Sequence, residues 1–172
     1  MSDVIVNKVA DSSLLTIDLE ELIPNEEPVI FDLKDFLFMG LIVKEKEFRA
    51  SLLQTDSEPY SNKTVLVTCS ADAVIPMWAY MLVAAQLQPV ARELFLGTKE
   101  EWKRKKLMEA IAALDLSKYQ QQRVVIKGCG EEPVPEAAYL EITSRLRPIV
   151  KSIMYGEPCS TVPIFKQPKS TA

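Results

Sequence analysis

The sequence predicts an α/β protein with a largely parallel sheet flanked by helices, and three observations support this fold class. Short apolar runs of strand length alternate along the chain with longer segments of helical periodicity. Residues 76–97 match residues 135–156 at an offset of 59 positions. A strand-like run and a cysteine precede each copy, so an internal strand–cysteine–helix–strand repeat covers about residues 64–97 and 123–156. Strands connected through helices of this length form parallel sheets with right-handed crossovers.

The two copies agree at positions that define a helix and its ends. Pro76 and Pro135 stand where each helix begins, a place that does not need a backbone N–H group. Pro89 and Pro148 stand near the far ends, where each stops or kinks its helix. Further identical pairs are Ala79/Ala138, Tyr80/Tyr139, Leu87/Leu146 and Gly97/Gly156.

The other elements follow from periodicity and from turn residues. Residues 4–10 have the character of a short helix or arm, and residues 55–62 form a turn-rich connector. A helix is expected within residues 35–53, although Gly40 obscures where it starts. The expected strands are 14–19, 29–33, 64–68, 94–96, 123–127 and 153–155, and the further helices are 76–91, 99–114 and 135–150.

Length and composition indicate one globular domain. The 172 residues suit a single α/β domain over residues 1–166 with a flexible tail at 167–172. A net charge of −4 argues against nucleic acid as a partner, because phosphate binding needs concentrated Lys and Arg. No apolar run is long enough to span a membrane, and the N-terminus lacks the charged and apolar regions of a signal peptide. We therefore expect a cytoplasmic protein without membrane contact.

Histidine is absent and cysteine is scarce, which restricts the chemistry. With no His, the chain has no Ser-His-Asp or Cys-His catalytic group and no His-ligated zinc. Cys69, Cys129 and Cys159 are an odd number, which in a reducing compartment suits thiols, metal ligands or catalytic groups better than disulfides.

Each cysteine follows a strand-like run, which favours a metal site. The carboxyl ends of parallel strands share one edge of a sheet, so we expect Cys69 and Cys129 on the same rim. With Cys159 they would provide three thiolates, which suit zinc or iron, and Asp72 or Glu157 would supply a fourth ligand. The first hypothesis is therefore a non-catalytic, metal-binding accessory protein.

Three alternatives remain open. The cysteines can be small apolar core residues. One of them can be the nucleophile of a thiol-dependent transferase or sulfur carrier, activated by a helix N-terminus or by Lys127. The chain can also be an interaction module without chemistry, and a homodimer is expected because homodimers are common.

Two further groups of residues are candidates. Asp32 and Asp35 follow the strand 29–33 and are possible acid groups, although Asp35 can simply cap the next helix. Trp78, Tyr80 and Tyr139 can line a pocket, but their places on amphipathic helices favour packing.

Four segments of the chain are distinctive together: Phe31-Asp-Leu-Lys-Asp-Phe-Leu, Thr68-Cys-Ser-Ala-Asp-Ala-Val-Ile-Pro-Met-Trp-Ala-Tyr-Met-Leu, Val125-Ile-Lys-Gly-Cys and Gly156-Glu-Pro-Cys-Ser-Thr-Val-Pro-Ile-Phe-Lys. They resemble a bacterial family catalogued as domain of unknown function 2480, and the resemblance covers residues 3–166. The resemblance implies no activity, but it implies a link to iron–sulfur cluster assembly proteins, whose clusters are held by cysteines.

Overall fold

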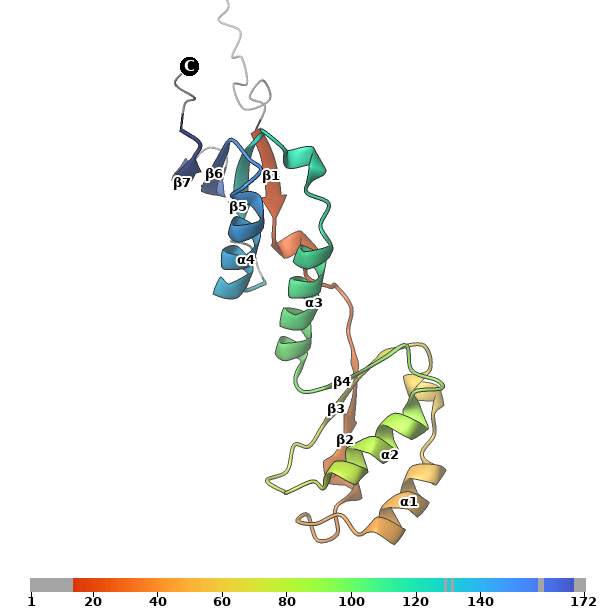
Figure 1. The fold of residues 1–172 in the computed structure, drawn as a ribbon. Helices are drawn as coiled ribbons and strands as arrows, with labels where there is room; N and C mark the ends of the chain where they lie inside the picture. Colours follow the sequence, from red (N-terminus) through yellow and green to blue (C-terminus); the bar gives the residue numbers. More distant parts are fainter. Residues whose placement is uncertain (1–13, 129, 131, 158–159, 169–172) are drawn as a thin grey trace, which may run out of the picture. The chain divides into compact units, whose positions relative to one another are not determined.

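A computed structural model describes residues 14–128, 130, 132–157 and 160–168 (Figure 1). The chain divides into two compact units. The three-stranded unit is residues 25–102, and the four-stranded unit is residues 1–24 together with 103–172. The second boundary falls inside the helix α3 (Lys99–Ala113).

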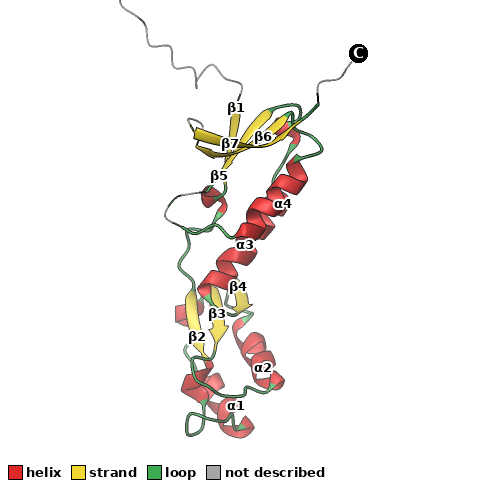
Figure 2. Cartoon of the chain, turned by 90° about the vertical axis from the view of Figure 1, so that its left-hand side faces the viewer, coloured by secondary structure: helices red, strands yellow, loops and turns green. Residues whose placement is uncertain are grey.

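The three-stranded unit is a βαβαβ arrangement with strand order β2-β3-β4, all parallel (Figures 1 and 2). Each parallel connection needs a crossover, which α1 and α2 provide. Its elements are β2 (Val29–Asp32), α1 (Glu45–Gln54), β3 (Thr64–Thr68), α2 (Met77–Leu87) and β4 (Glu93–Leu96).

Both helices of this unit pack on the same face of its sheet. Val65 and Val67 alternate along β3 and enter one buried cluster with Phe31 of β2. The same cluster contains Phe48 and Leu52 of α1 and the buried α2 residues Ala79, Val83 and Leu87.

The four-stranded unit repeats this plan and adds an edge strand. Its strand order is β1-β5-β6-β7, with β7 antiparallel to β6. Helices α3 and α4 pack on one face, where Ile111 and Ile142 meet Val124 and Ile153 in one buried cluster. Its remaining elements are β1 (Leu14–Asp18), β5 (Arg123–Lys127), α4 (Glu136–Leu146), β6 (Ser152–Glu157) and β7 (Ser160–Lys166).

The structure confirms the mixed α/β class with parallel strands flanked by helices, and it corrects three details. The strands form two sheets, because β1 pairs with β5 while β2 pairs with β3. Helix α1 begins only at Glu45, after a turn in which Met39 and Gly40 have positive φ of 52° and 71°. Strand β7 was not expected.

Other expectations concern residues or arrangements that stay predictions. Residues 4–10 and 169–172 lie outside the described residues, and the single domain over residues 1–166 stays a prediction. Cys129 also lies outside, so the cysteine part of the repeat stays a prediction. In the part of the chain that the structure describes, no helix is long and apolar enough to cross a membrane.

The buried face of α4 provides a test of the fold. Ile142 is fully buried, so Ile142→Ala should lower the free energy of unfolding by about 2–5 kcal/mol. Leu140 lies on the same helix but is 73% exposed, so Leu140→Ala should change it by about 0.5 kcal/mol or less. Urea denaturation of both variants measures this difference, and equal losses would contradict the buried face described above.

Candidate functional site

Cys69 is the one predicted cysteine ligand within the described residues. It follows β3, is partly buried against the core of the three-stranded unit and forms no disulfide. Its thiol donates a weak hydrogen bond to the carbonyl of Ala71, with a sulfur–oxygen distance of 3.6 Å. Cys129 and Cys159 lie outside the described residues. Since β3 and β5 belong to different sheets, the expectation that these two strands share one rim is wrong, and the position of Cys129 relative to Cys69 stays a prediction.

The predicted oxygen ligands fall in different units. Asp72 is exposed in the loop between β3 and α2, whereas Glu157 is exposed at the end of β6. Among the residues that the structure describes, no three Cys, Asp or Glu side chains gather to hold a metal ion. The metal site stays a prediction, because two of its thiols are not described.

The loop after β3 is held by Asp32 at the end of β2. The Asp32 carboxylate accepts hydrogen bonds from the backbone N–H of Ser70 at 3.0 Å and from the Ser70 hydroxyl at 2.5 Å. It also accepts the N–H of Lys34 and so caps a short 3-10 helix at Leu33–Phe36. Asp35 lies inside that 3-10 helix, so its predicted role as a cap of the next helix is wrong.

Burial raises the pKa of the Asp32 carboxyl, but the hydrogen bonds from Ser70 and Lys34 outweigh it and leave the pKa below its ordinary value. The same carboxylate cannot serve as a proton donor near neutral pH. Asp32 is therefore a loop anchor here.

The corresponding carboxylate of the four-stranded unit is Asp18, at the end of β1. It accepts the N–H of Glu20 at 3.1 Å and pairs with the Lys127 ammonium at 2.8 Å. The pKa of Lys127 is raised by its hydrogen bond to Asp18 and by the negative charges of Asp18 and Glu157. Lys127 is thus a charged partner of carboxylates, which makes it a poor proton acceptor for a thiol.

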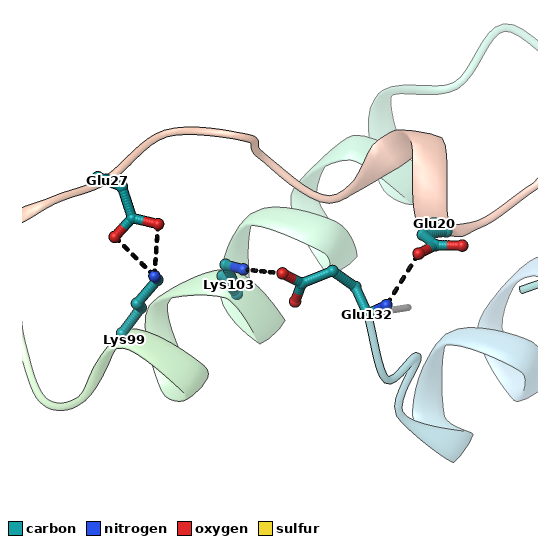
Figure 3. Close-up of polar contacts among 5 residues, drawn as sticks. All are labelled: Glu20, Glu27, Lys99, Lys103 and Glu132. Carbon is teal, nitrogen blue, oxygen red and sulfur yellow. Dashed lines mark hydrogen bonds and ion pairs between the residues drawn. The ribbon is translucent and has the colours of Figure 1, made fainter. Parts of the chain in front are cut away.

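Ion pairs on α3 fix neighbouring segments within each unit (Figure 3). In the three-stranded unit, Lys99 Nζ lies 2.6 Å from both carboxylate oxygens of Glu27. In the four-stranded unit, Lys103 Nζ lies 2.7 Å from Glu132, whose backbone N–H donates to Glu20 at 2.8 Å. The second group holds the loop that connects β5 to α4.

The aromatic candidates pack against neighbouring groups, and Tyr139 also lines a pocket. Trp78 contacts the Phe48 ring edge-on at 5.9 Å. Tyr139 donates its hydroxyl to the Gly128 carbonyl at 3.1 Å and meets Tyr155 edge-on at 5.6 Å. Tyr139 and Tyr155 also line an open, mostly apolar pocket of about 330 Å³ between α4 and the strands β5 to β7.

The exposed side of α2 is a surface that the sequence-based candidates missed. We define the α2 face as Met77, Met81, Ala84, Ala85 and Gln88, whose spacing places them on one side of the helix. Met77 and Met81 are 72% and 70% exposed, and Val74 just before the helix is 88% exposed. The signal was present in the sequence, because residues 73–91 contain no Asp, Glu, Lys or Arg although 26% of the chain is charged.

Helix α4 shows that this fold does not require such a face. It connects the parallel strands β5 and β6 as α2 connects β3 and β4, and its residues match those of α2 at an offset of 59 positions in the sequence. Residues 132–150 carry five charged side chains where residues 73–91 carry none. The α4 residues equivalent to the α2 face are Glu136, Leu140, Thr143, Ser144 and Arg147.

These features define a mixed α/β protein of two units. The sequence profile of a family described as "Protein of unknown function (DUF2480)" matches residues 3–167, so the chain belongs to that family. The resemblance noted in the sequence is therefore confirmed. No curated protein and no solved structure matches the chain.

The Asp32 anchor predicts a pH-dependent contribution to stability. Because its pKa is lowered by folding, the contribution is present above the unfolded pKa of about 4 and is lost as pH falls through the lower folded pKa. Ser70→Ala should thus lower the free energy of unfolding at neutral pH by about 0.5–1.5 kcal/mol. Urea denaturation at neutral and strongly acidic pH should show this difference shrinking in acid, and a constant difference would contradict the anchor.

Proposed function

We propose that this protein is a non-catalytic interaction module that docks a second copy of the chain on the α2 face. The observation that carries the proposal is the uncharged, exposed side of α2, which contrasts with the charged side of α4. Exposed apolar patches of this kind are typical of interaction sites, and Met side chains adapt well to a partner surface.

The contrast between α2 and α4 depends on the inference that β3–α2–β4 and β5–α4–β6 are copies of one unit. Their strand registers are related by the same offset as the sequence repeat. Asn62 and Gln121, which that offset also relates, have positive φ of 55° and 56°. Their N–H groups donate to the carbonyls of Val90 and Ile149, both at 2.8 Å. Agreement in such uncommon backbone geometry supports a duplicated unit.

Charge permits a second copy as the partner only at a face without ionisable groups. Each chain carries a net charge of −4, so two copies repel each other over most of their surfaces. The α2 face contains no ionisable group, so two such faces can meet without burying like charges.

The shape of the α2 face also favours self-association. Its bulky residues, Met77 and Met81, lie in the N-terminal half of the helix, whereas the small Ala84 and Ala85 lie toward the C-terminus. Two antiparallel copies related by a twofold axis place each Met81 opposite Ala85 of the other copy. A twofold interface needs this self-complementarity, in which one position contacts a second and the second contacts the first.

Sedimentation velocity over a wide range of protein concentration tests the dimer. Met81→Glu should raise the dissociation constant at least about 100-fold, because two carboxylates of like charge would be buried. Leu140→Glu is the matched control on α4 and should leave it unchanged, since Leu140 is 73% exposed. A wild-type chain that stays monomeric, or equal effects of both variants, would refute the proposal.

A charge-neutral exchange tests the contact between positions 81 and 85. Met81→Ala and Ala85→Met should each weaken the dimer, by a cavity and by overpacking respectively. The double variant restores one large and one small residue at each contact and should recover most of the wild-type affinity.

The three-thiolate site is a second proposal, favoured by the position of Cys69. Its thiol is partly exposed at the carboxyl end of β3, where α/β proteins place ligands. In this proposal Cys69, Cys129 and Cys159 bind zinc or iron, and Asp72 or Glu157 supplies a fourth ligand. The link to iron–sulfur assembly proteins and a cytoplasmic location belong to this proposal as well.

Elemental analysis of protein purified without chelator, combined with a native thiol count, checks the metal site. About one zinc or iron per chain with three unreactive thiols is expected. Each Cys→Ser variant should lose the metal. No metal and one fast-reacting thiol would instead support a thiol-dependent transferase or sulfur carrier.

A further inference from the structure

The four-stranded sheet carries an open groove of about 820 Å³ at the end where β5 and β6 begin. The strand register places Arg123, Ser152 and Lys166 opposite one another on β5, β6 and β7. Adjacent strands lie about 4.8 Å apart, so the backbones at Arg123 and Lys166 are about 10 Å apart with Ser152 between them. Lys151 lines the groove immediately before β6.

The lining combines positive charge with an apolar floor. Arg123, Lys151 and Lys166 are its ionisable members, and among the described lining residues none is acidic. This is unusual in a chain with 24 acidic and 20 basic residues. Met154 and its register partner Pro163 supply apolar surface. Phe165 pairs with the buried Ile153 and packs against the core under the helices, where the Arg147 guanidinium lies 3.8 Å from the centre of its ring.

Backbone hydrogen bonds hold the rim of the groove. The N–H of Gln121 donates to Ile149 at 2.8 Å, and the N–H of Lys151 donates to Gln122 at 2.8 Å. The N–H of Gln167 donates to Lys151 at 2.9 Å and so ties the end of β7 to the start of β6. The cations therefore project from a defined frame, which is a requirement for a binding site.

The same place in the three-stranded unit is neutralised by the chain itself. Arg92, which the repeat makes equivalent to Lys151, forms an ion pair with Glu26 and donates a hydrogen bond to Thr64 at 3.1 Å. Glu93 stands where the four-stranded unit has Ser152. One unit thus supplies carboxylates at this edge, whereas the described lining of the other supplies only cations and neutral groups.

We propose that this groove binds a small organic anion, whose phosphate or carboxylate head lies among Arg123, Lys151 and Lys166 and whose apolar body lies on Met154 and Pro163. Guanidinium and ammonium groups bind either kind of head through charge-assisted hydrogen bonds. The volume of the groove suits a small molecule. This site is independent of the α2 face.

Isothermal titration calorimetry of the full chain with phenyl phosphate, benzoate and inorganic phosphate tests the proposal. At least one of the two organic probes should bind saturably, at least about tenfold more tightly than inorganic phosphate, because only they contact the apolar floor. The probe that binds more tightly identifies the head group. The affinity should fall as salt is added, because charge attracts the head.

Charge-removing variants assign the binding to the groove. Arg123→Gln and Lys151→Gln should each weaken the organic probe at least about fivefold, since each removes one charge-assisted hydrogen bond. Lys118→Gln makes the same charge change at an exposed residue of the 3-10 helix Ser117–Tyr119 and should have no effect. The proposal is overturned if neither organic probe binds, if inorganic phosphate binds equally well, or if all three variants behave alike.

Discussion

The burial of one face of each parallel sheet under its crossover helices is the constraint on which the rest of the structure depends. Parallel strands cannot be joined by tight turns, so each pair requires a helix that crosses over the sheet. Because both sheets run in sequential strand order, both helices of each unit cover the same face. The inner sides of α2 and α4 are therefore fixed as apolar, while their outer sides and the strand ends can vary without loss of the fold.

The outer sides of the helices and the strand ends differ between the two βαβ units. The outer side of α2 carries no charge, whereas that of α4 carries Glu136 and Arg147. The two units also differ at the amino-terminal ends of the strands, because Arg92 is paired with Glu26 while the described lining around Lys151 has no carboxylate. We infer that the two units are copies of one another. A residue that differs between equivalent positions of the two units is therefore not required by the fold.

Strand β7 is the element that makes the four-stranded unit different. By pairing antiparallel with β6, it adds an edge strand that the three-stranded sheet lacks. It contributes Lys166 and Pro163 to the proposed anion groove, and Ile164 to the smaller pocket beside Tyr139. Its Pro163 suits an edge strand, since an edge position does not need every backbone N–H.

The sequence by itself determined the local elements, because their signals are local. Apolar runs, the flanking prolines and the internal repeat located β3, α2, β5 and α4 to within a few residues. Strand β7 was missed, because its residues alternate weakly and include a proline. The uncharged stretch at residues 73–91 was visible in the sequence, but only the exposure of Met77 and Met81 shows that it faces outward.

Only the tertiary structure decided how the strands pair. Strands β1 and β2 are adjacent in the sequence and similar in character, so nothing local indicates that one joins β5 and the other β3. That choice depends on hydrogen bonds between residues far apart in the chain, and it produces two sheets where one was expected. For the same reason the sequence could suggest cysteines at strand ends, but the row of Arg123, Ser152 and Lys166 exists only through the register of three strands.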